Sequence, residues 1–175
     1  QQMSINTYSY WLSTHLGNSE NEVRKLLADK SALYFLMTWS IFESKCFNGY
    51  CKIEKIDKFA DNLNKTIEFE NSTLSTQHFH ERYQCDELFD NLMHKQKCSR
   101  MIAVLEKPFN EARREDLIYF IVIVIYRYRN NIFHGNKGVK SWLKYREQIE
   151  HCIAAMQVMV SHTESTTQST KTMNL

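Results

Sequence analysis

The chain has few residues that interrupt helices and no apolar run long enough for a membrane span. One proline and four glycines among 175 residues are fewer turn residues than a β-rich fold requires, so we predict an all-α fold. The longest apolar run is about half of the ~20 residues that a spanning helix needs, so we expect no membrane segment. The first basic residue is Arg24, and we therefore expect no secretory signal and a cytoplasmic protein.

The cysteines and histidines do not have the spacing of metal or disulfide sites. Five cysteines, an odd number with no Cys-x-x-Cys pair, favour reduced thiols over a disulfide framework or a zinc site. His78 and His80 are two residues apart and would point about 200° apart on a helix. We interpret them as solvated surface histidines, and we expect neither a metal nor a cofactor.

Hydrophobic periodicity and capping signals divide the chain into helices. Ser19 and Glu22 have the spacing of a capping box, Asn48-Gly49 should end a helix, and Ser/Thr-rich residues 67–77 should form a loop. The expected helices are 5–16, 19–47, 53–66, 79–94, 98–107, 111–133 and 140–162.

The helix 111–133 should be the central one. Its apolar run from Leu117 to Tyr126 is rich in β-branched residues and would suit a strand, but it is longer than usual strands and strong helix formers flank it. An apolar helix of this kind is buried on all sides. We predict a single domain over residues 1–162. Residues 163–175 are Ser/Thr-rich and almost free of apolar side chains, and we predict a disordered tail there.

Positive charge is concentrated in one part of the chain. Between Arg113 and Arg146 there are eight basic and two acidic residues, a net charge of +6. The whole chain carries +2, so the remainder carries −4. This asymmetry is expected if the ligand is anionic, although a solvated basic helix face would give the same pattern.

A polar cluster, Arg129-Asn130-Asn131-Ile132-Phe133-His134, follows the apolar run. Arginine binds phosphate through two parallel N–H donors and stays charged, and histidine titrates near neutrality. Together they supply what metal-free cleavage of a phosphodiester needs, a cation for the phosphate and a proton-transfer group. Tyr126, Asn130 and His134 are four residues apart and would form one stripe, so Asn130 should orient the His134 ring or the substrate.

The same residues carry a resemblance to a known superfamily. Arg129-Asn130-x-x-x-His134, followed by Gly135-Asn136-Lys137, resembles the Arg-x4–6-His signature of the HEPN superfamily (higher eukaryotes and prokaryotes nucleotide-binding). Trp39-Ser40-Ile41-Phe42-Glu43-Ser44-Lys45 is similar to a segment that carries an acidic residue facing the active site in bacterial relatives. Arg127 also satisfies the spacing, as Arg-x6-His, but Arg129 is preferred because Asn130 follows it.

The resemblance implies an up-and-down bundle of four to five main helices that forms a homodimer. It also implies a metal-independent endoribonuclease that leaves 2′,3′-cyclic phosphate and 5′-OH ends, often a toxin or an anti-phage defence effector. Expected partners are RNA, a second copy and an antitoxin protein. The implied catalytic residues are Arg129, His134 and Asn130, with Glu43 as a further candidate; the candidate substrate-binding residues are Arg127, Asn131, Lys137 and Tyr126.

Other interpretations of these residues remain open at this point. Arginine and histidine at a helix C-terminus can simply cap carbonyl groups and complement the helix dipole. Glu43 can pair with Lys45 alone, and Trp39 and Tyr128 are most simply packing residues. The chain can also be a catalytically silent module that binds RNA, a nucleotide or a partner protein.

Overall fold

The computed structural model describes residues 4–64, 73–133 and 141–173, and all regular structure in these ranges is helical. The all-α prediction is therefore confirmed. The elements are α1 (Ile5–Leu16), α2 (Glu20–Ala28), α3 (Ser31–Phe47), α4 (Ile53–Asn64), α5 (Thr73–Arg82), α6 (Asp86–Met93), α7 (Ser99–Leu105), a 3₁₀ turn (Phe109–Glu111), α8 (Arg114–Phe133), α9 (Ser141–Lys144) and α10 (Arg146–Met173). None of these helices is both long enough and apolar enough to cross a bilayer.

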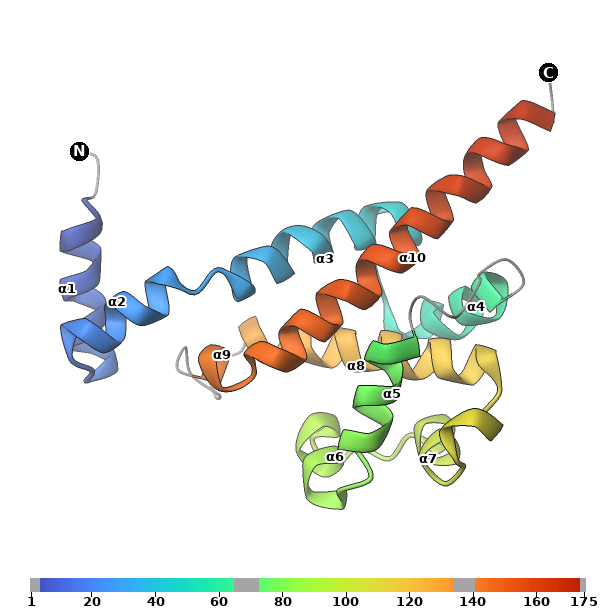
Figure 1. The fold of residues 1–175 in the computed structure, drawn as a ribbon, viewed down its shortest axis with the longest axis horizontal. Helices are drawn as coiled ribbons and strands as arrows, with labels where there is room; N and C mark the ends of the chain where they lie inside the picture. The colour runs from blue at the N-terminus through green and yellow to red at the C-terminus, as the bar shows by residue number, and fades with distance from the viewer. Residues whose placement is uncertain (1–3, 65–72, 134–140, 174–175) are drawn as a thin grey trace.

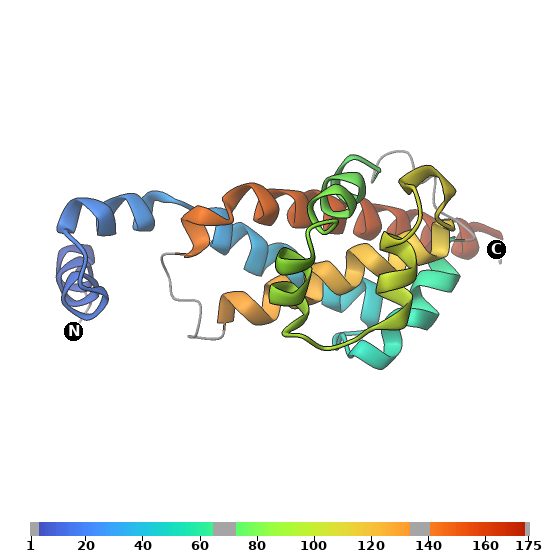
Figure 2. The ribbon, with the colours of Figure 1, turned by 90° about the horizontal axis from the view of Figure 1, so that it is seen from below.

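Helix α8 is the centre of the molecule, as its composition predicted. Every residue from Leu117 to Ile125 is buried, because α3, α4, α5, α7 and α10 all pack around this helix (Figures 1 and 2). The choice of helix over strand for the β-branched run is confirmed. Burial on all sides explains the run, since no side of the helix between Leu117 and Ile125 meets water.

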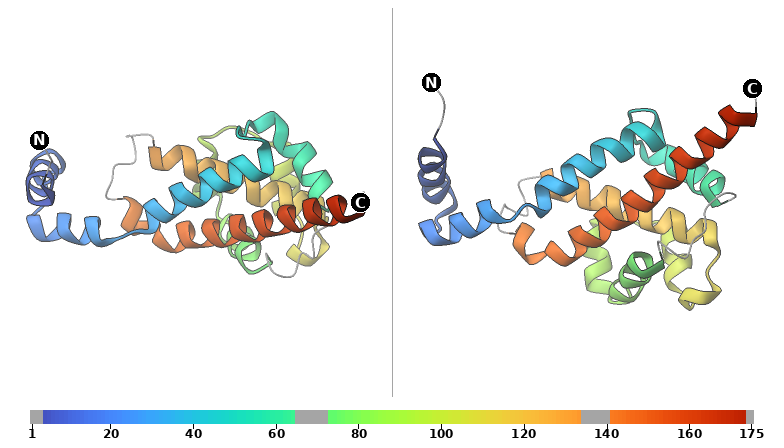
Figure 3. Two further views of the ribbon diagram at one scale, coloured as in Figure 1. Left: turned by 90° about the horizontal axis from the view of Figure 1, so that it is seen from above. Right: turned by 45° about the horizontal axis from the view of Figure 1, so that its top comes forward.

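The order of the helices differs from a simple up-and-down bundle. Helices α3 and α10 lie side by side and run in the same direction, whereas α8 runs opposite to both (Figures 1 and 3). The short helices α5, α6 and α7 form a separate group on one side of α8. The expected four to five helices are thus supplemented by several short ones in the described residues.

The N-terminal hairpin is built on the signals that the sequence shows. Gly17 ends α1 with φ of 62°, and Ser19 and Glu22 form the reciprocal capping box that starts α2. Leu12, Val23 and Leu26 form a small hydrophobic cluster of their own. The hairpin stands at one end of the molecule, away from the main core (Figure 1).

The single helix expected over 19–47 is wrong, because the chain breaks at Asp29. Asp29 adopts an extended conformation, and its carboxylate accepts hydrogen bonds from the backbone N–H and the hydroxyl of Ser31. Its other oxygen lies 3.6 Å from Arg146 at the start of α10. The hydrogen bonds of this partly buried aspartate to Ser31, the first residue of α3, therefore compete successfully with helix continuation.

Two further boundaries differ from the prediction. Part of the expected loop 67–77 is helical, since α5 begins at Thr73, and residues 65–72 lie outside the described residues. The expected helix 79–94 is divided after Arg82. Cys85 is extended, and Asp86 and Glu87 start α6, where acidic side chains complement the positive end of the helix dipole.

The C-terminal helix is longer than predicted. Residues 163–175 were expected to be a disordered tail, but α10 continues to Met173, so this boundary is corrected. The segment contains neither proline nor glycine. Adding residues to an existing helix needs no new nucleus, and Ser and Thr cost only a fraction of a kcal/mol each, up to roughly 0.7.

Candidate functional site

Arg129 lies at the end of α8, on the side that faces α3. Its guanidinium group lies 5.8 Å from the centre of the Trp39 ring and donates a hydrogen bond to Asn130 Oδ1 at 3.1 Å. Tyr126, one turn earlier, lies 6.4 Å from the same indole between ring centres. Trp39 is 3% exposed, so its interpretation as a core residue is confirmed. Packing of α3 on α8 thus brings the two HEPN-like segments together.

Asn130 differs from its expected role in one respect. Its Oδ1 accepts a bond from Arg129 and so orients the guanidinium group. His134, which Asn130 was expected to orient, lies outside the described residues, as does Lys137. Because His134 is not described, the stripe of Tyr126, Asn130 and His134 remains a prediction.

Arg127 and Asn131 face the other side of α8. Arg127 Nη2 donates to Gln96 Oε1 at 2.6 Å, and His94 Nε2 lies 2.9 Å from Asn131 Oδ1. Both partners belong to the turn after α6, where His94 has φ of 52°. A residue other than glycine adopts this left-handed backbone conformation at a cost in free energy, and the bond between His94 and Asn131 helps to offset that cost.

Glu43, the acidic candidate on α3, forms a hydrogen bond with the backbone. Its Oε1 accepts a hydrogen bond from the backbone N–H of Cys51 at 2.9 Å, which fixes the turn that follows α3. Burial raises the pKa of the Cys51 thiol to about 12, the Glu43 carboxylate adds to this rise, and Arg129 opposes it. The charges of Glu43 and Arg129 thus act in opposite directions on the same thiol.

A pocket of about 60 Å³ opens beside the same end of α8, on the side of Asn131. Its polar and aromatic lining comes from four helices, the turn after α5 and the turn before α10: Arg82, Tyr83, Asn91, Tyr128, Asn131, Trp142 and Tyr145. The Tyr83 hydroxyl donates to that of Tyr128 at 3.1 Å, and burial raises the pKa of Tyr128 to about 12. At neutral pH both phenols are therefore protonated, and Tyr128 is a packing residue as predicted.

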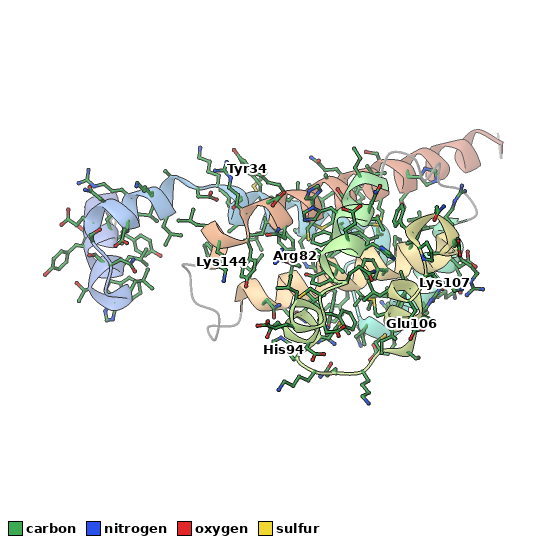
Figure 4. All side chains as sticks on the ribbon, turned by 60° about the horizontal axis from the view of Figure 1, so that its bottom comes forward. Tyr34, Arg82, His94, Glu106, Lys107 and Lys144 are labelled. Atoms are coloured by element: carbon green, nitrogen blue, oxygen red, sulfur yellow. The ribbon has the colours of Figure 1, made fainter. Side chains whose placement is uncertain are left out.

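Arg82 is the site residue that the sequence did not reveal. It is the last residue of α5, and Figure 4 shows it with Lys144 to its left and His94 below it. Its Nε is buried and has no hydrogen-bond partner among the described residues. No sequence signal marks Arg82, because it is a single arginine on a polar helix that is distant in the chain from the cluster.

The basic stretch is not one patch. Arg113 and Arg114 lie at the opposite end of α8 from Arg129, about 22 Å away at ~1.5 Å per residue. Arg113 pairs with Asp116 at 2.8 Å, and Arg146 pairs with Glu150 at 3.0 Å. Fewer positive charges therefore surround the polar cluster than the sequence suggested. Arg82, from outside the basic stretch, adds one positive charge there.

Comparison of the chain with protein-family models, with curated proteins and with solved structures found no match.

Proposed function

We propose that the protein is a metal-independent endoribonuclease of the HEPN type that acts in the cytoplasm as a toxin or an anti-phage defence effector. One observation carries this proposal: Trp39 and Arg129, 90 residues apart in the chain, meet where α3 packs on α8. Each belongs to one of the two segments that resemble this superfamily. An active site formed by both segments requires that they lie next to each other in the fold.

In the proposed reaction the ribose 2′-OH attacks the neighbouring phosphorus atom. His134 moves the proton, and Arg129 stabilises the charge on the non-bridging oxygens. The 5′ oxygen leaves, which gives a 2′,3′-cyclic phosphate and a 5′-OH end. Arg129 enters this reaction already oriented by Trp39 and Asn130, so less conformational entropy is lost on binding.

The pocket beside Asn131 supports RNA as the ligand. Aromatic faces stack on nucleobases, amides bond to base edges, and Arg82 can reach a phosphate. At about 60 Å³ this pocket is smaller than a nucleobase, so we assign it to contact with the edge of a nucleotide next to the cleaved bond, and entry of a whole base would require the pocket to widen. Asn131 and Arg127 would have to exchange their bonds to His94 and Gln96 for bonds to RNA.

Cleavage of labelled RNA by the purified protein, beside His134→Ala, tests the proposal. Loss of the proton-transfer group should reduce the rate by about 10²–10⁴-fold, whereas the fold should persist because the substitution follows the end of α8. The products should carry cyclic phosphate ends. A folded His134→Ala protein that cleaves at the wild-type rate would remove this residue from the chemistry.

Cleavage should also be insensitive to chelation of divalent ions. The described residues that surround Arg129 include no group of His, Cys, Asp and Glu side chains close enough to share an ion. The rate in EDTA should therefore equal the rate in Mg²⁺ at the same ionic strength. Activity that EDTA abolishes and Mg²⁺ restores would contradict the proposed mechanism.

A second candidate function is a binding module without catalysis. The bonds of Glu43 to Cys51, Arg127 to Gln96 and Asn131 to His94 favour it, because they engage candidate site residues with the protein itself. This alternative predicts that the protein binds labelled RNA or a partner protein, and that RNA stays intact at every enzyme concentration tested. Anisotropy and gel analysis of the same samples separate the two functions.

A further inference from the structure

A cluster of two histidines and a glutamate lies between α5 and α10, outside the candidate site. His78 comes from α5, and Glu147 and His151 are four residues apart on α10. One nitrogen or oxygen of each side chain lies within 4.8 Å of the other two. Two imidazoles and a carboxylate are a ligand set that zinc accepts, with a fourth position left for water.

The surroundings of the cluster fix its histidines in a state that can bind a metal ion. The buried Ser75 hydroxyl lies 3.2 Å from His151 Nδ1, which leaves Nε2 of this ring to act as a ligand. Nε2 of His78 is buried and has no hydrogen-bond partner among the described residues. Burial lowers the pKa of His78, and the neighbouring His151 lowers it further.

The two imidazole rings are stacked, with centres 4.0 Å apart and planes 20° apart. Tetrahedral coordination with bonds of ~2.1 Å would place ligand atoms ~3.4 Å from one another. The ligand atoms must therefore approach one another by about 1 Å, and the two stacked rings must rotate until their nitrogen lone pairs point at a common ion. Glu147 is exposed and accepts one long hydrogen bond, 3.4 Å, from Gln148 Nε2, and His78 and His151 are only partly buried. The required movement therefore falls on side chains and not on the packed helices.

We propose that His78, Glu147 and His151 bind one divalent transition-metal ion of the zinc class, which ties α5 to α10. Imidazole ligands favour zinc-class ions over Mg²⁺ and Ca²⁺, which take oxygen ligands. The ion has a structural role and takes no part in RNA cleavage. This inference is independent of the proposed function, because it rests on residues that the proposed reaction does not use.

The test uses the full chain, stripped of metal with a chelator and then dialysed. Calorimetric titration with Zn²⁺ should give one ion per chain and a rise in melting temperature, and Co²⁺ should give the visible absorption of a four-coordinate site. Glu147→Gln should weaken Zn²⁺ binding by at least ~10-fold, and His151→Ala should remove it. His15→Ala, a histidine on the distant α1, is the matched control and should bind as the wild type does.

Glu147→Gln decides the result if His151→Ala does not fold, since Glu147 is exposed. Absence of Zn²⁺ binding by the wild-type chain would overturn the inference, as would equal affinity in the Glu147→Gln variant. The five thiols are competing ligands, and an ion bound by them would show intense sulfur-to-cobalt charge-transfer absorption in the near ultraviolet. That spectrum would place the ion on cysteines and also overturn the inference.

Discussion

Arg129 and Arg127 are two residues apart, and the structure gives them different neighbours. Arg129 rests on the Trp39 indole, whereas Arg127 is bonded to Gln96 in the turn after α6. A helix turns about 100° per residue, so such side chains point to nearly opposite sides. Substitutions at the two positions can consequently be interpreted separately.

Arg129→Lys should reduce RNA cleavage at least ~100-fold, because an ammonium group cannot reproduce the guanidinium fork and stacks less well on an indole. The melting temperature should change little, since Arg129 is only partly buried. Arg114→Lys, an exposed residue at the other end of α8, is the matched control. A rate for Arg129→Lys close to that of the control would exclude Arg129 from transition-state stabilisation.

Predictions of burial for single residues were right where the residue type and its neighbours in sequence determine burial. They were wrong where a partner distant in sequence determines it. Trp39 and Tyr128 were expected to pack in the core, and both are buried. His80 was expected on the surface, which is wrong: it is 5% exposed, and its Nε2 lies 3.1 Å from the carbonyl oxygens of Val104 and Lys107. Those acceptors come from α7 and the turn after it, which no periodicity around His80 reveals.

At the scale of helices, one arginine joins three of them. Arg100 on α7 donates from Nε to Asp116 Oδ1 on α8 at 2.8 Å, and its other nitrogens pair with Asp57 and Asp61 on α4. The hydrogen bonds from Arg113 and Arg100 lower the pKa of Asp116 and outweigh burial, which acts in the opposite direction. The carboxylate therefore stabilises the fold in its ionised form.

Asp116→Asn should lower the free energy of unfolding at pH 7 by about 1–3 kcal/mol, because it leaves partly buried guanidinium donors without their charged acceptor. The pKa of Asp116 is lower in the folded state than the unfolded value near 3.8, so its contribution is complete above about pH 5. The contribution is lost as the pH falls through the folded pKa. The difference between wild type and variant should accordingly shrink in acid.

Urea unfolding of both proteins at a series of pH values measures this difference. Asp57→Asn is the control, because this side chain is 60% exposed and its ion pair should contribute less than about 1 kcal/mol. An equal loss of stability in the two variants, or a difference that does not depend on pH, would contradict the assignment.

Helix ends were predictable where a cap is encoded in adjacent residues. Gly17, the Ser19 capping box and Asn48 all act as the sequence indicates. The break at Asp29 was missed because the apolar period continues across it. The hydrogen bond from the Ser31 backbone N–H to Asp29 and the proximity of Asp29 to Arg146, which is distant in sequence, together decide this boundary.

At the scale of the whole molecule, α3 has a second apolar face. Between Ser31 and Phe42 it carries no charged residue, and one side of it packs in the core. The opposite side exposes Leu33, Tyr34, Met37 and Ile41, each 51–57% accessible. An apolar stripe of this length beside Trp39 is the surface at which we expect two copies of the chain to associate.

Met37→Glu should convert the expected dimer to a monomer, because it places a charge in the middle of this stripe. Sedimentation at micromolar concentration should give about twice the chain mass of 20.9 kDa for the wild type and the single mass for the variant. Leu74→Glu replaces a leucine that is 79% exposed on α5, away from the stripe, and should leave the dimer intact. A wild-type mass near one chain would refute association at this surface.

The class of the fold was predictable from the sequence, but the arrangement of its helices was not. Scarcity of proline and glycine and the apolar period determine that the chain is helical and that α8 is central. The parallel packing of α3 on α10 joins segments more than a hundred residues apart, so neither segment's own pattern reveals its partner. For the same reason Arg82, which comes to the end of α8 from α5, was not predictable.

The packing of α3 on α10 also affects how the chain folds during synthesis. Helix α3 leaves the ribosome before α10, the helix that covers its inner face, so both apolar sides of α3 are exposed until α10 has been made. Contacts between segments this distant form slowly because a long loop must close first. In the interval between the synthesis of α3 and that of α10, the nascent chain therefore presents an uncharged, aromatic-rich segment to chaperones or to neighbouring nascent chains.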